Sequence, residues 1–331
     1  SISGIPYSLQ FKGEASEDII EEFKNISMLV RLSKRLPTSL TGLGKRADED
    51  KKKFRRVLSS KGYLGGKVSF RISAKPDKAV VKFSIMTGER YKISTIKIKS
   101  KDNPTILKGV KQEFLNDVLN IYPAEDVDLK NILDSAKALK RYLQEQGYPF
   151  ADVEEPVGYI DHQNKSLIVH FKIKTGLLVF IKSAQVTGLK DVEEQFIRNR
   201  FQWKPEQQYS IKTIEETNSV LANTQLISSS EIEPSIFDSS PCKLDDKGNP
   251  SPQPIILNAK MTEAAPRFIG VGVRYATGDG LGGHFFWHHN NLFGSQEHLG
   301  TSVKVSRRLK RMKLSYALRD FGAPLQELNT Q

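Results

Sequence analysis

The sequence predicts an α+β protein in which three tandem β-α-α-β-β units precede a run of antiparallel strands. The first observation behind this prediction is an internal repeat: residues 56–63 align with residues 141–148, and residues 80–88 align with residues 168–176. The spacings of 85 and 88 residues are long enough for each copy to be a small domain with its own core. The second observation is strict alternation of apolar with polar or small residues along three runs within residues 267–319, as in strands that have one apolar face.

The composition limits the class of protein. A chain of 331 residues is long enough for two or three domains, and 38% hydrophobic content with no apolar run of 18 residues excludes a helical membrane protein. The net charge of +12 favours an anionic partner such as nucleic acid, an anionic membrane surface or an acidic protein. The single cysteine, Cys242, excludes an internal disulfide bond and lies in a polar insertion, residues 239–254, that we interpret as a loop. No signal peptide opens the chain, which fits either a mature, cleaved N-terminus or a cytosolic protein.

Each unit follows the order strand, helix, helix, strand, strand. In the first unit, Ser16 is expected to cap a helix that starts at Glu17. A second helix is expected over residues 48–61, with acids in its first turn and bases later, as the helix dipole favours. In the second unit, a helix is expected from Pro104 and a longer one over residues 128–146.

A glycine follows the second helix of the first two units. Gly62 and Gly147 stand at equivalent places of the repeat, and a tyrosine follows each. We predict that both glycines end their helices with positive φ. The third unit, with helices expected over residues 192–201 and 211–226, has Gln225 at this place, which leaves the geometry of its helix end open.

Each unit ends in two strands, and the first strand of the pair is expected at a sheet edge. Residues 68–73 and 152–157 are less apolar than the strands that follow them, residues 79–85 and 167–173, which suit a central position. An exposed edge accepts an added strand through main-chain hydrogen bonds with little demand on sequence. The candidate partner-binding residues on these edges are Val68, Phe70, Ile72, Val153 and Val157.

The alternating runs fit two settings, a soluble antiparallel sheet with one wet face and the strands of a transmembrane barrel, which are about 10 residues long. In the second setting, Gly270 and Gly272 either weaken the pairing of the first strand or allow close packing inside the barrel. The residues expected to face lipid are Ile269, Val271, Val273, Tyr275, Met312, Leu314, Tyr316 and Leu318.

No motif in the sequence predicts catalysis. His284, His288, His289 and His298 form a cluster, but His289 opposes His284 and His288 on a strand, and no cysteine or carboxylate completes a metal site. The glycine-rich residues 278–283 join two strands and supply no helix N-terminus to a phosphate. The sequence contains no Gly-x-Ser-x-Gly motif and no P-loop. We therefore expect no catalytic residue, no cofactor and no metal ion.

The order and spacing of these features resemble a known family. Tandem β-α-α-β-β units with Gly-Tyr after the second helix, followed directly by barrel-like strands, are similar to the polypeptide-transport-associated (POTRA) domains that precede the barrel of bacterial outer-membrane protein assembly factors. Three units rather than five resemble the TamA-type subunit of the translocation and assembly module more than BamA. The strand segments that carry the rest of the resemblance are residues 270–277, 297–299, 315–316 and 324–325.

The resemblance implies a domain organisation. POTRA-like domains are expected at residues 1–89, 90–177 and 178–265. Residues 266–331 would form the N-terminal part of an outer-membrane β-barrel, truncated after about four strands. Four strands are too few to close a barrel, and an open sheet edge is not tolerated in the hydrocarbon region.

The resemblance also implies a function without enzymatic activity. The protein would be a translocation and assembly factor of the Gram-negative outer membrane, with its POTRA region in the periplasm. Its partners would be unfolded outer-membrane or autotransporter clients, a periplasm-spanning inner-membrane subunit (TamB-like) and outer-membrane lipid, with no nucleic acid. The lateral-gate first strand would contain Gly270, Val271, Gly272 and Val273.

Three alternatives stay open at this stage. Within the same class, the chain could be a BamA-like protein or a two-partner-secretion transporter. From another class, its basic charge and small α/β units also fit a soluble RNA-binding protein. The sequence lacks the RNP aromatic pair that would favour RNA binding.

Overall fold

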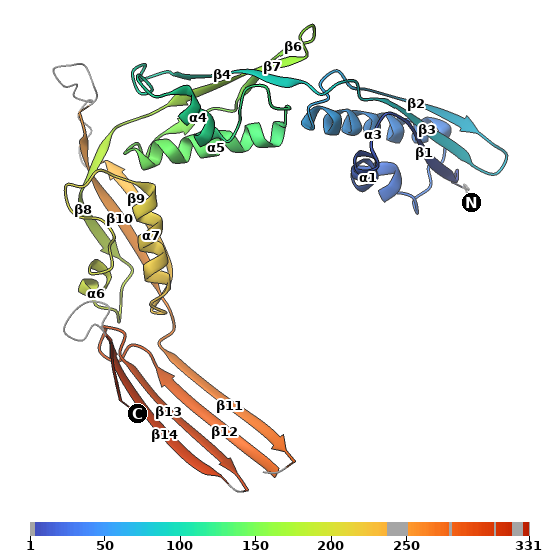
Figure 1. Ribbon diagram of the computed structural model, residues 1–331. Helices are drawn as coiled ribbons and strands as arrows, with labels where there is room; N and C mark the ends of the chain where they lie inside the picture. The colour runs from blue at the N-terminus through green and yellow to red at the C-terminus, as the bar shows by residue number, and fades with distance from the viewer. Residues whose placement is uncertain (1–3, 237–250, 278–279, 308, 320–326, 331) are drawn as a thin grey trace. The chain divides into compact units, whose positions relative to one another are not determined.

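The computed structural model describes residues 4–236, 251–277, 280–307, 309–319 and 327–330 (Figure 1). By its internal contacts the chain divides into two compact units, residues 1–142 with 152–175 and residues 143–151 with 176–331. The described residues form three mixed sheets that carry helices and one antiparallel meander. Cys242 and most of the predicted loop at residues 239–254 lie outside the described residues, as do Gly278 and Asp279 of the glycine-rich turn.

The first sheet has the predicted β-α-α-β-β order and one additional short helix. Its elements are β1 (Tyr7–Gly13), α1 (Glu17–Ile26), α2 (Met28–Arg31), α3 (Leu40–Ser60), β2 (Lys67–Ala74) and β3 (Ala79–Met86). The strand order is β1-β3-β2, with β1 parallel and β2 antiparallel to the central β3. Helices α1 and α3 lie on the same face of this sheet (Figure 1). Phe23 of α1 and Phe54 of α3 are fully buried there, with ring centroids 4.4 Å apart.

The short helix α2 depends on a buried carboxylate of α3. Asp50 is fully buried and accepts hydrogen bonds from Ser27 Oγ at 2.5 Å, Met28 N at 2.6 Å and Leu29 N at 3.0 Å. Ser27 Oγ in turn accepts a hydrogen bond from Val30 N at 3.1 Å. Because the first N–H groups of a helix have no partner within it, Asp50 satisfies the start of α2 from a neighbouring helix.

The second sheet repeats this plan, with its last edge divided. Its elements are β4 (Lys92–Ser100), α4 (Gln112–Leu119), α5 (Leu129–Glu145), β5 (Asp152–Val153), β6 (Val157–Asp161) and β7 (Ser166–Lys174). The central β7 is parallel to β4 and antiparallel to both β5 and β6. The single strand predicted over residues 152–157 is therefore wrong: Glu154, Glu155 and Pro156 interrupt it. Proline lacks the N–H that a strand donates, so it suits such a break.

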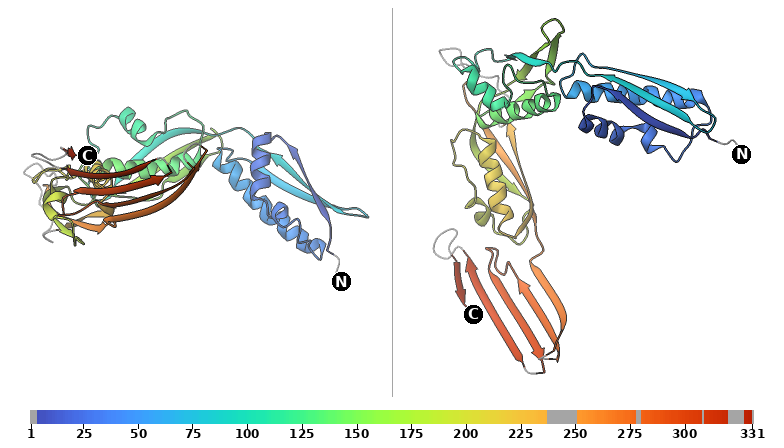
Figure 2. Two further views of the ribbon diagram at one scale, coloured as in Figure 1. Left: turned by 90° about the horizontal axis from the view of Figure 1, so that it is seen from below. Right: turned by 45° about the vertical axis from the view of Figure 1, so that its right-hand side comes forward.

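The third sheet has the same topology. Its elements are β8 (Val179–Thr187), α6 (Glu194–Arg198), α7 (Ile211–Ala222), β9 (Ile227–Ile236) and β10 (Gln253–Glu263). The strand order is β8-β10-β9, with β8 parallel and β9 antiparallel to the central β10. Helix α7 lies along one face of this sheet (Figure 1 and the right-hand view of Figure 2). The core beneath it includes Trp203, which is 8% exposed.

The fourth sheet is the predicted antiparallel meander. Its strands are β11 (Arg267–Ala276), β12 (Gly280–His289), β13 (His298–Ser306), β14 (Lys310–Arg319) and β15 (Glu327–Thr330). Strands β11 to β14 run side by side in the order of the sequence (Figure 2). The sequence predicted about four strands, and the described residues contain a fifth, because the four residues of β15 pair with β14. A run that short carries too few residues for its periodicity to be recognised.

Two predicted helices start elsewhere. Helix α3 begins at Leu40, after Ser39 Oγ accepts a hydrogen bond from Gly42 N at 3.1 Å, so the acids at 48 and 49 do not lie in a first turn. Helix α4 begins at Gln112, because the chain turns with Gly109 at φ 84° after Pro104. In both cases local turn and cap chemistry decided the helix start.

The predicted ends of the longer helices are confirmed. Gly62 follows α3 with φ 91°, and Gly147 follows α5 with φ 94°. Gln225, which replaces this glycine in the third unit, also has positive φ, at 60°. The helix end is therefore repeated in all three units, although the third unit builds it with a residue that has a Cβ atom.

Among the described residues, no helix combines the length and the apolar character needed to cross a membrane.

Candidate functional site

The predicted edge strands lie at sheet edges, but their candidate residues face different surroundings. Strand β2 pairs only with β3, and its Val68, Phe70 and Ile72 are partly buried against the core of the first sheet. Their side chains therefore support the fold, and the main chain of β2 is the part that an added strand would contact. In the second sheet, Val153 is partly buried in β5, whereas Val157 of β6 is 41% exposed.

The carbonyl of each helix-end glycine also accepts a hydrogen bond from an N–H group near the start of the strand that follows, a contact that we call a joint. Tyr91 N, just before β4, donates to Gly62 O at 2.9 Å, and Val179 N, at the start of β8, donates to Gly147 O at 3.0 Å. Each joint has a second hydrogen bond from a side chain to the carbonyl of the preceding residue. These are Arg90 Nε to Lys61 O at 3.0 Å and Gln208 Nε2 to Gln146 O at 2.7 Å. The Gly-Tyr repeat thus marks both a helix end and a glycine carbonyl that binds the N–H group near the start of the following strand.

A second repeated contact holds the end of each central strand. In the first unit, Glu14 accepts hydrogen bonds from Thr87 N at 3.0 Å and Gly88 N at 3.3 Å. In the second unit, Asp102 accepts a hydrogen bond from Thr175 N at 2.9 Å. The repeated Thr-Gly pairs therefore have a structural role, since their N–H groups bind a carboxylate that follows the first strand.

The third unit reverses this contact. Glu263, at the end of β10, accepts hydrogen bonds from the N–H groups of Lys190 at 2.7 Å, Asp191 at 3.0 Å and Val192 at 2.9 Å. The carboxylate now belongs to the last strand, and the N–H donors follow the first strand. The turn at residues 190–192 is thereby fixed in place.

This fixed turn contacts the loop between β12 and β13. Asn291 Nδ2 donates to Asp191 O at 2.8 Å, and Glu193 N donates to Gly294 O at 3.0 Å. Gln296 Nε2 also donates to Thr224 O, near the end of α7. Residues 290–297, which we call the docking turn, therefore attach the meander to the third sheet. Sequence analysis missed this role, although the run of polar residues at the turn was visible.

The docking turn is held in shape by its own polar side chains. Asn291, Gln296 and Glu297 are 6%, 6% and 5% exposed. Glu297 Oε2 accepts hydrogen bonds from Phe293 N at 3.0 Å and Ser295 N at 3.3 Å, and Gln296 has φ 67°. Buried polar groups need partners. The loop itself supplies those of Glu297, whereas the side chains of Asn291 and Gln296 donate to carbonyls outside the loop.

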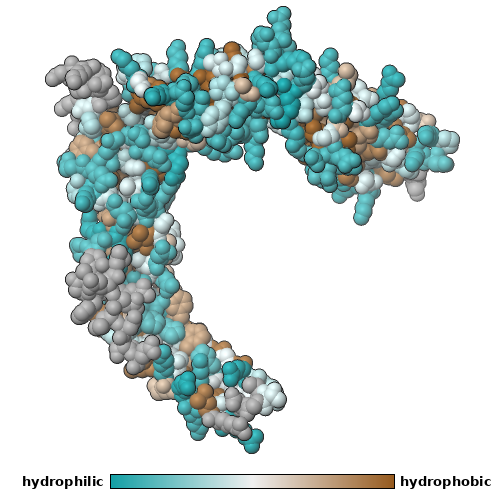
Figure 3. All heavy atoms as spheres, viewed as in Figure 1, coloured by the Kyte–Doolittle hydropathy of each residue, from teal (hydrophilic) through white to brown (hydrophobic). Residues whose placement is uncertain are grey.

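The meander has two faces of opposite character. The cross-strand register places Ile269 opposite Trp287, Trp287 opposite Thr301, and Thr301 opposite Leu314, so all four share one face. The predicted lipid-facing residues of β11 and β14 lie on this same apolar face. Val271 and Val273 are 79% and 77% exposed. Apolar atoms reach the surface over these strands in Figure 3.

The other face is polar and basic. It carries Gly270, Phe286, Ser302 and Lys313, which are opposite one another in successive strands. A Cβ atom on Gly270 would lie 2.2 Å from the Phe286 ring, whereas nothing lies within 4 Å of the Cβ position of Gly272. Close packing therefore accounts for the first glycine, and not for the second.

The histidines are divided between the two faces. His284 and His288 share the polar face, and the rings of His288 and His298 have centroids 5.1 Å apart. His289 lies on the opposite face and is 9% exposed, and its Nδ1 accepts a hydrogen bond from Asn291 N at 3.3 Å. The part of the chain that the structure describes contains no group of three or more His, Cys, Asp or Glu arranged to hold a metal ion.

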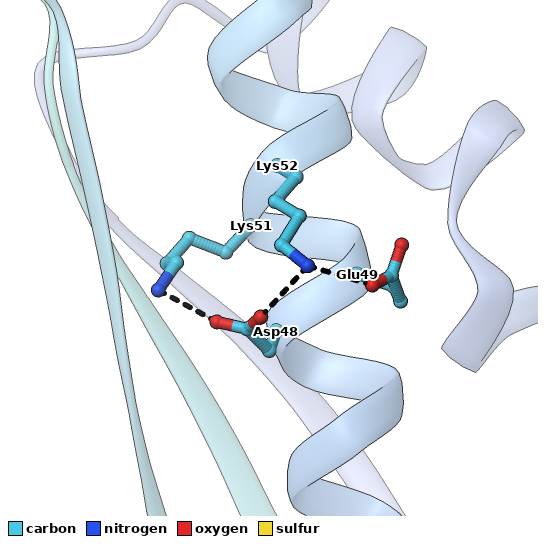
Figure 4. Close-up of polar contacts among 4 residues, drawn as sticks. All are labelled: Asp48, Glu49, Lys51 and Lys52. Atoms are coloured by element: carbon cyan, nitrogen blue, oxygen red, sulfur yellow. Dashed lines mark hydrogen bonds and ion pairs between the residues drawn. The ribbon is translucent and has the colours of Figure 1, made fainter.

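The acids and bases of α3 form a solvated ion-pair cluster (Figure 4). Lys51 Nζ lies 2.7 Å from Asp48 Oδ1, and Lys52 Nζ lies 3.2 Å from Asp48 Oδ2 and 2.8 Å from Glu49 Oε1. The hydrogen bond from Lys51 and that from Lys52 lower the pKa of Asp48. Exposed pairs of this kind contribute little to stability and suggest no chemistry.

These features together define a chain of POTRA-type sheets followed by an antiparallel meander. Residues 91–176, which contain the second sheet, match the protein-family model described as "POTRA: Surface antigen variable number repeat". The comparison with curated protein sequences finds no match.

Solved structures to which this chain is similar include chains of BamA and CdiB. The crystal structure of BamA from Haemophilus ducreyi lacking POTRA domains 1–3 has 16% sequence identity and a TM-score of 0.56, over 70% of this chain and 40% of that chain. Haemophilus influenzae BamA POTRA3–5 has 19% identity and a TM-score of 0.46, over 79% and 96%. CdiB from Acinetobacter baumannii has 14% identity and a TM-score of 0.33, over 69% and 41%. The chain thus spans less than half the length of the first of these relatives.

Proposed function

We propose that the protein is a translocation and assembly factor of the Gram-negative outer membrane. Its POTRA-type sheets would lie in the periplasm and receive unfolded outer-membrane or autotransporter clients. Its meander would begin a membrane-embedded β-barrel, with β11 as the first strand of a lateral gate. The domain boundaries at residues 89/90, 177/178 and 265/266 belong to this proposal.

The observation that carries the proposal is the apolar face of the meander. A soluble sheet packs its apolar face against a core, yet Val271, Val273 and Met312 are 79%, 77% and 73% exposed. Contiguous exposed apolar surface of this kind marks a membrane or protein contact. Alternation with a polar face is typical of barrel strands, whose outer face meets lipid.

The gate assignment rests on the position and composition of β11. Among the described strands, β11 pairs with β12 alone, so it is an edge of the sheet. It contains Gly270, Val271, Gly272 and Val273, and Gly272 has open space beside it. Glycine without a packing contact weakens a strand and eases its separation from a neighbour.

The experiment that tests the proposal compares two lysine substitutions in the membrane-assembled protein. Val273→Lys places a charge on the apolar face and should cost about 2–4 kcal/mol at the bilayer midplane, whereas Ser315→Lys on the polar face should be tolerated. Heat-modifiable mobility of the folded barrel on gels reports assembly. Equal tolerance of both substitutions would refute the membrane assignment.

The finer form of the proposal is a TamA-type subunit with a periplasm-spanning inner-membrane partner (TamB-like). A photo-crosslinking residue placed at exposed Ser69 of β2 would test it in cells. Capture of an inner-membrane protein supports the TamA-type form. Capture of outer-membrane clients alone favours a BamA-like form.

A further inference from the structure

The second sheet contains a cavity of about 500 Å³ beside strand β4. Its apolar lining comes from β4, from β7, from α4 and from the segment before α4: Ile96, Ile98, Phe171, Leu115, Leu107 and Val110. The polar and basic residues Lys97, Lys99, Gln112, His170 and Lys172 complete the lining. The register places Ile98 opposite Phe171, so both side chains lie on the face of the sheet that the cavity occupies. We call this space the β4 cavity.

The main chain of β4 is open next to this cavity. At the start of the strand, Ile93 N donates to Glu125 O at 2.8 Å, and Ala124 N donates to Ile93 O at 2.7 Å, which covers the edge there. Beyond that point, no described strand pairs with residues 96–100 on the side away from β7. The opposite edge of the same sheet is less suited to an added strand, because Glu154, Glu155 and Pro156 interrupt it.

The other face of β4 is basic. Lys97 and Lys99 are exposed, and Lys99 lies opposite Lys172 of β7. Glu154 forms an ion pair with Lys101, so this acid is already matched. No acidic residue is among those that line the described β4 cavity.

The cavity, the open main chain of β4 and the basic face together form a site for an extended segment that adds to the sheet as a strand. An added strand places alternate side chains on opposite faces. Beside residues 96–100, one set of its side chains would enter the apolar β4 cavity, and the other set would lie beside Lys97 and Lys99. Main-chain pairing supplies affinity in this mode of recognition, and pockets for alternate side chains supply specificity.

We propose that the β4 edge binds an extended polypeptide segment in which apolar residues alternate with acidic residues. This proposal rests on the proposed function for one point, which is that the bound segment belongs to a client in extended form. Its test uses soluble peptides and no membrane, so its failure is distinct from failure of the membrane assignment.

The first arm of the test varies the peptide. Fluorescein-labelled peptides with five Val-Glu repeats, five Val-Lys repeats, or five valines followed by five glutamates are titrated against the whole chain by fluorescence anisotropy. The alternating Val-Glu peptide is expected to bind roughly tenfold more tightly than either of the others, because only it satisfies both faces. Equal binding of the block peptide would reduce the site to non-specific charge attraction and overturn the proposal, as would no binding of the Val-Glu peptide.

The second arm varies the protein. Replacing Lys97 and Lys99 together by glutamate should weaken Val-Glu binding roughly tenfold and strengthen Val-Lys binding. The matched control, Lys82→Glu, reverses the same kind of exposed charge on the central strand of the first sheet and should change neither affinity. Val110→Trp should weaken binding by filling the β4 cavity while the lysines stay in place.

Hydrogen exchange then locates the bound peptide and checks the fold of each variant. The Val-Glu peptide should slow exchange at amides of residues 96–100 in the unmodified chain. Protection at β2 alone, or full binding by the Lys97/Lys99 variant that exchange shows to be folded, would overturn the assignment to β4.

Discussion

Gln225→Gly is a substitution that we expect to stabilise the protein. Gln225 has φ 60° at the place where the other two units have glycine with φ 91° and 94°. Left-handed backbone costs a residue with a Cβ atom about 1–2 kcal/mol, and glycine avoids this strain. Glycine also raises the conformational entropy of the unfolded chain, which offsets part of the gain. The Gln225 side chain is exposed, so its loss removes little packing. The net gain expected for the part of the chain that contains the third sheet is about 0.5–1 kcal/mol.

Replacing Gly62 or Gly147 by alanine should destabilise the protein, by an amount that depends on the atoms around each glycine. A Cβ atom on Gly147 would lie 2.8 Å from Leu178 Cδ1 and 2.6 Å from Gln208 Nε2, which are ends of movable side chains. On Gly62 it would lie 2.3 Å from Val127 O, which is main chain. We expect a cost of about 1–2 kcal/mol for Gly147→Ala and about 2–4 kcal/mol for Gly62→Ala.

Tryptophan fluorescence measures the effect at Gln225. Trp203 lies in the core beside the third sheet, and Trp287 is the other tryptophan, so a Trp287→Phe background isolates the signal. With a urea slope of about 1–2 kcal/mol/M, Gln225→Gly should raise the unfolding midpoint by roughly 0.5 M. The matched control is Asn223→Gly, at φ −70°, where glycine should lower the midpoint. A fall of the midpoint in Gln225→Gly would refute the reasoning.

Three further outcomes follow from buried or paired groups. Asp50→Ala removes the acceptor of three hydrogen bonds and should lower the free energy of unfolding by about 3 kcal/mol. Ser135→Ala, at the equivalent place of the repeat, should lower it by about 1 kcal/mol. Urea unfolding measures both losses, and hydrogen exchange of the α2 amides reports the local effect of Asp50→Ala. Burial raises the pKa of Tyr209 to about 12. Because this folded pKa exceeds the unfolded value of about 10, the stabilisation is complete below pH 10 and is lost as pH rises to 12. It is at most about 2–3 kcal/mol, and Tyr209→Phe should flatten the dependence of Trp203 unfolding on pH. Asn291→Ala removes the hydrogen bond from the docking turn to Asp191 O and should speed amide hydrogen exchange across residues 290–297. An unchanged exchange rate in β11 is the internal control.

The sequence was sufficient where one residue type determines local geometry. Gly62 and Gly147 could be placed at helix ends because few other residues adopt positive φ there. The faces of the meander could be assigned because the side-chain period of a strand is two, and register then follows from which residues are apolar. The pairing of Ile269 with Trp287 agrees with that pattern.

The sequence was insufficient where contacts join distant segments or where several local signals compete. Pro104 is suited to a first helical turn, yet Gly109 with φ 84° delays α4 to Gln112. The docking turn joins Asn291 to Asp191, which is 100 residues earlier, and its partner there is a main-chain carbonyl that no side-chain pattern reveals. The β4 cavity likewise depends on how the segment before α4 lies against the sheet.

The reversed carboxylate of the third unit explains why this copy of the repeat departs from the other two. Glu14 and Asp102 follow the first strand and bind N–H groups at the end of the central strand. In the third unit, Glu263 occupies the end of the central strand and binds N–H groups that follow the first strand. This arrangement directs the Asp191 carbonyl towards Asn291 of the docking turn, at 2.8 Å. The third unit therefore lacks the Thr-Gly contact, and the turn after its first strand instead serves as the attachment point for the meander.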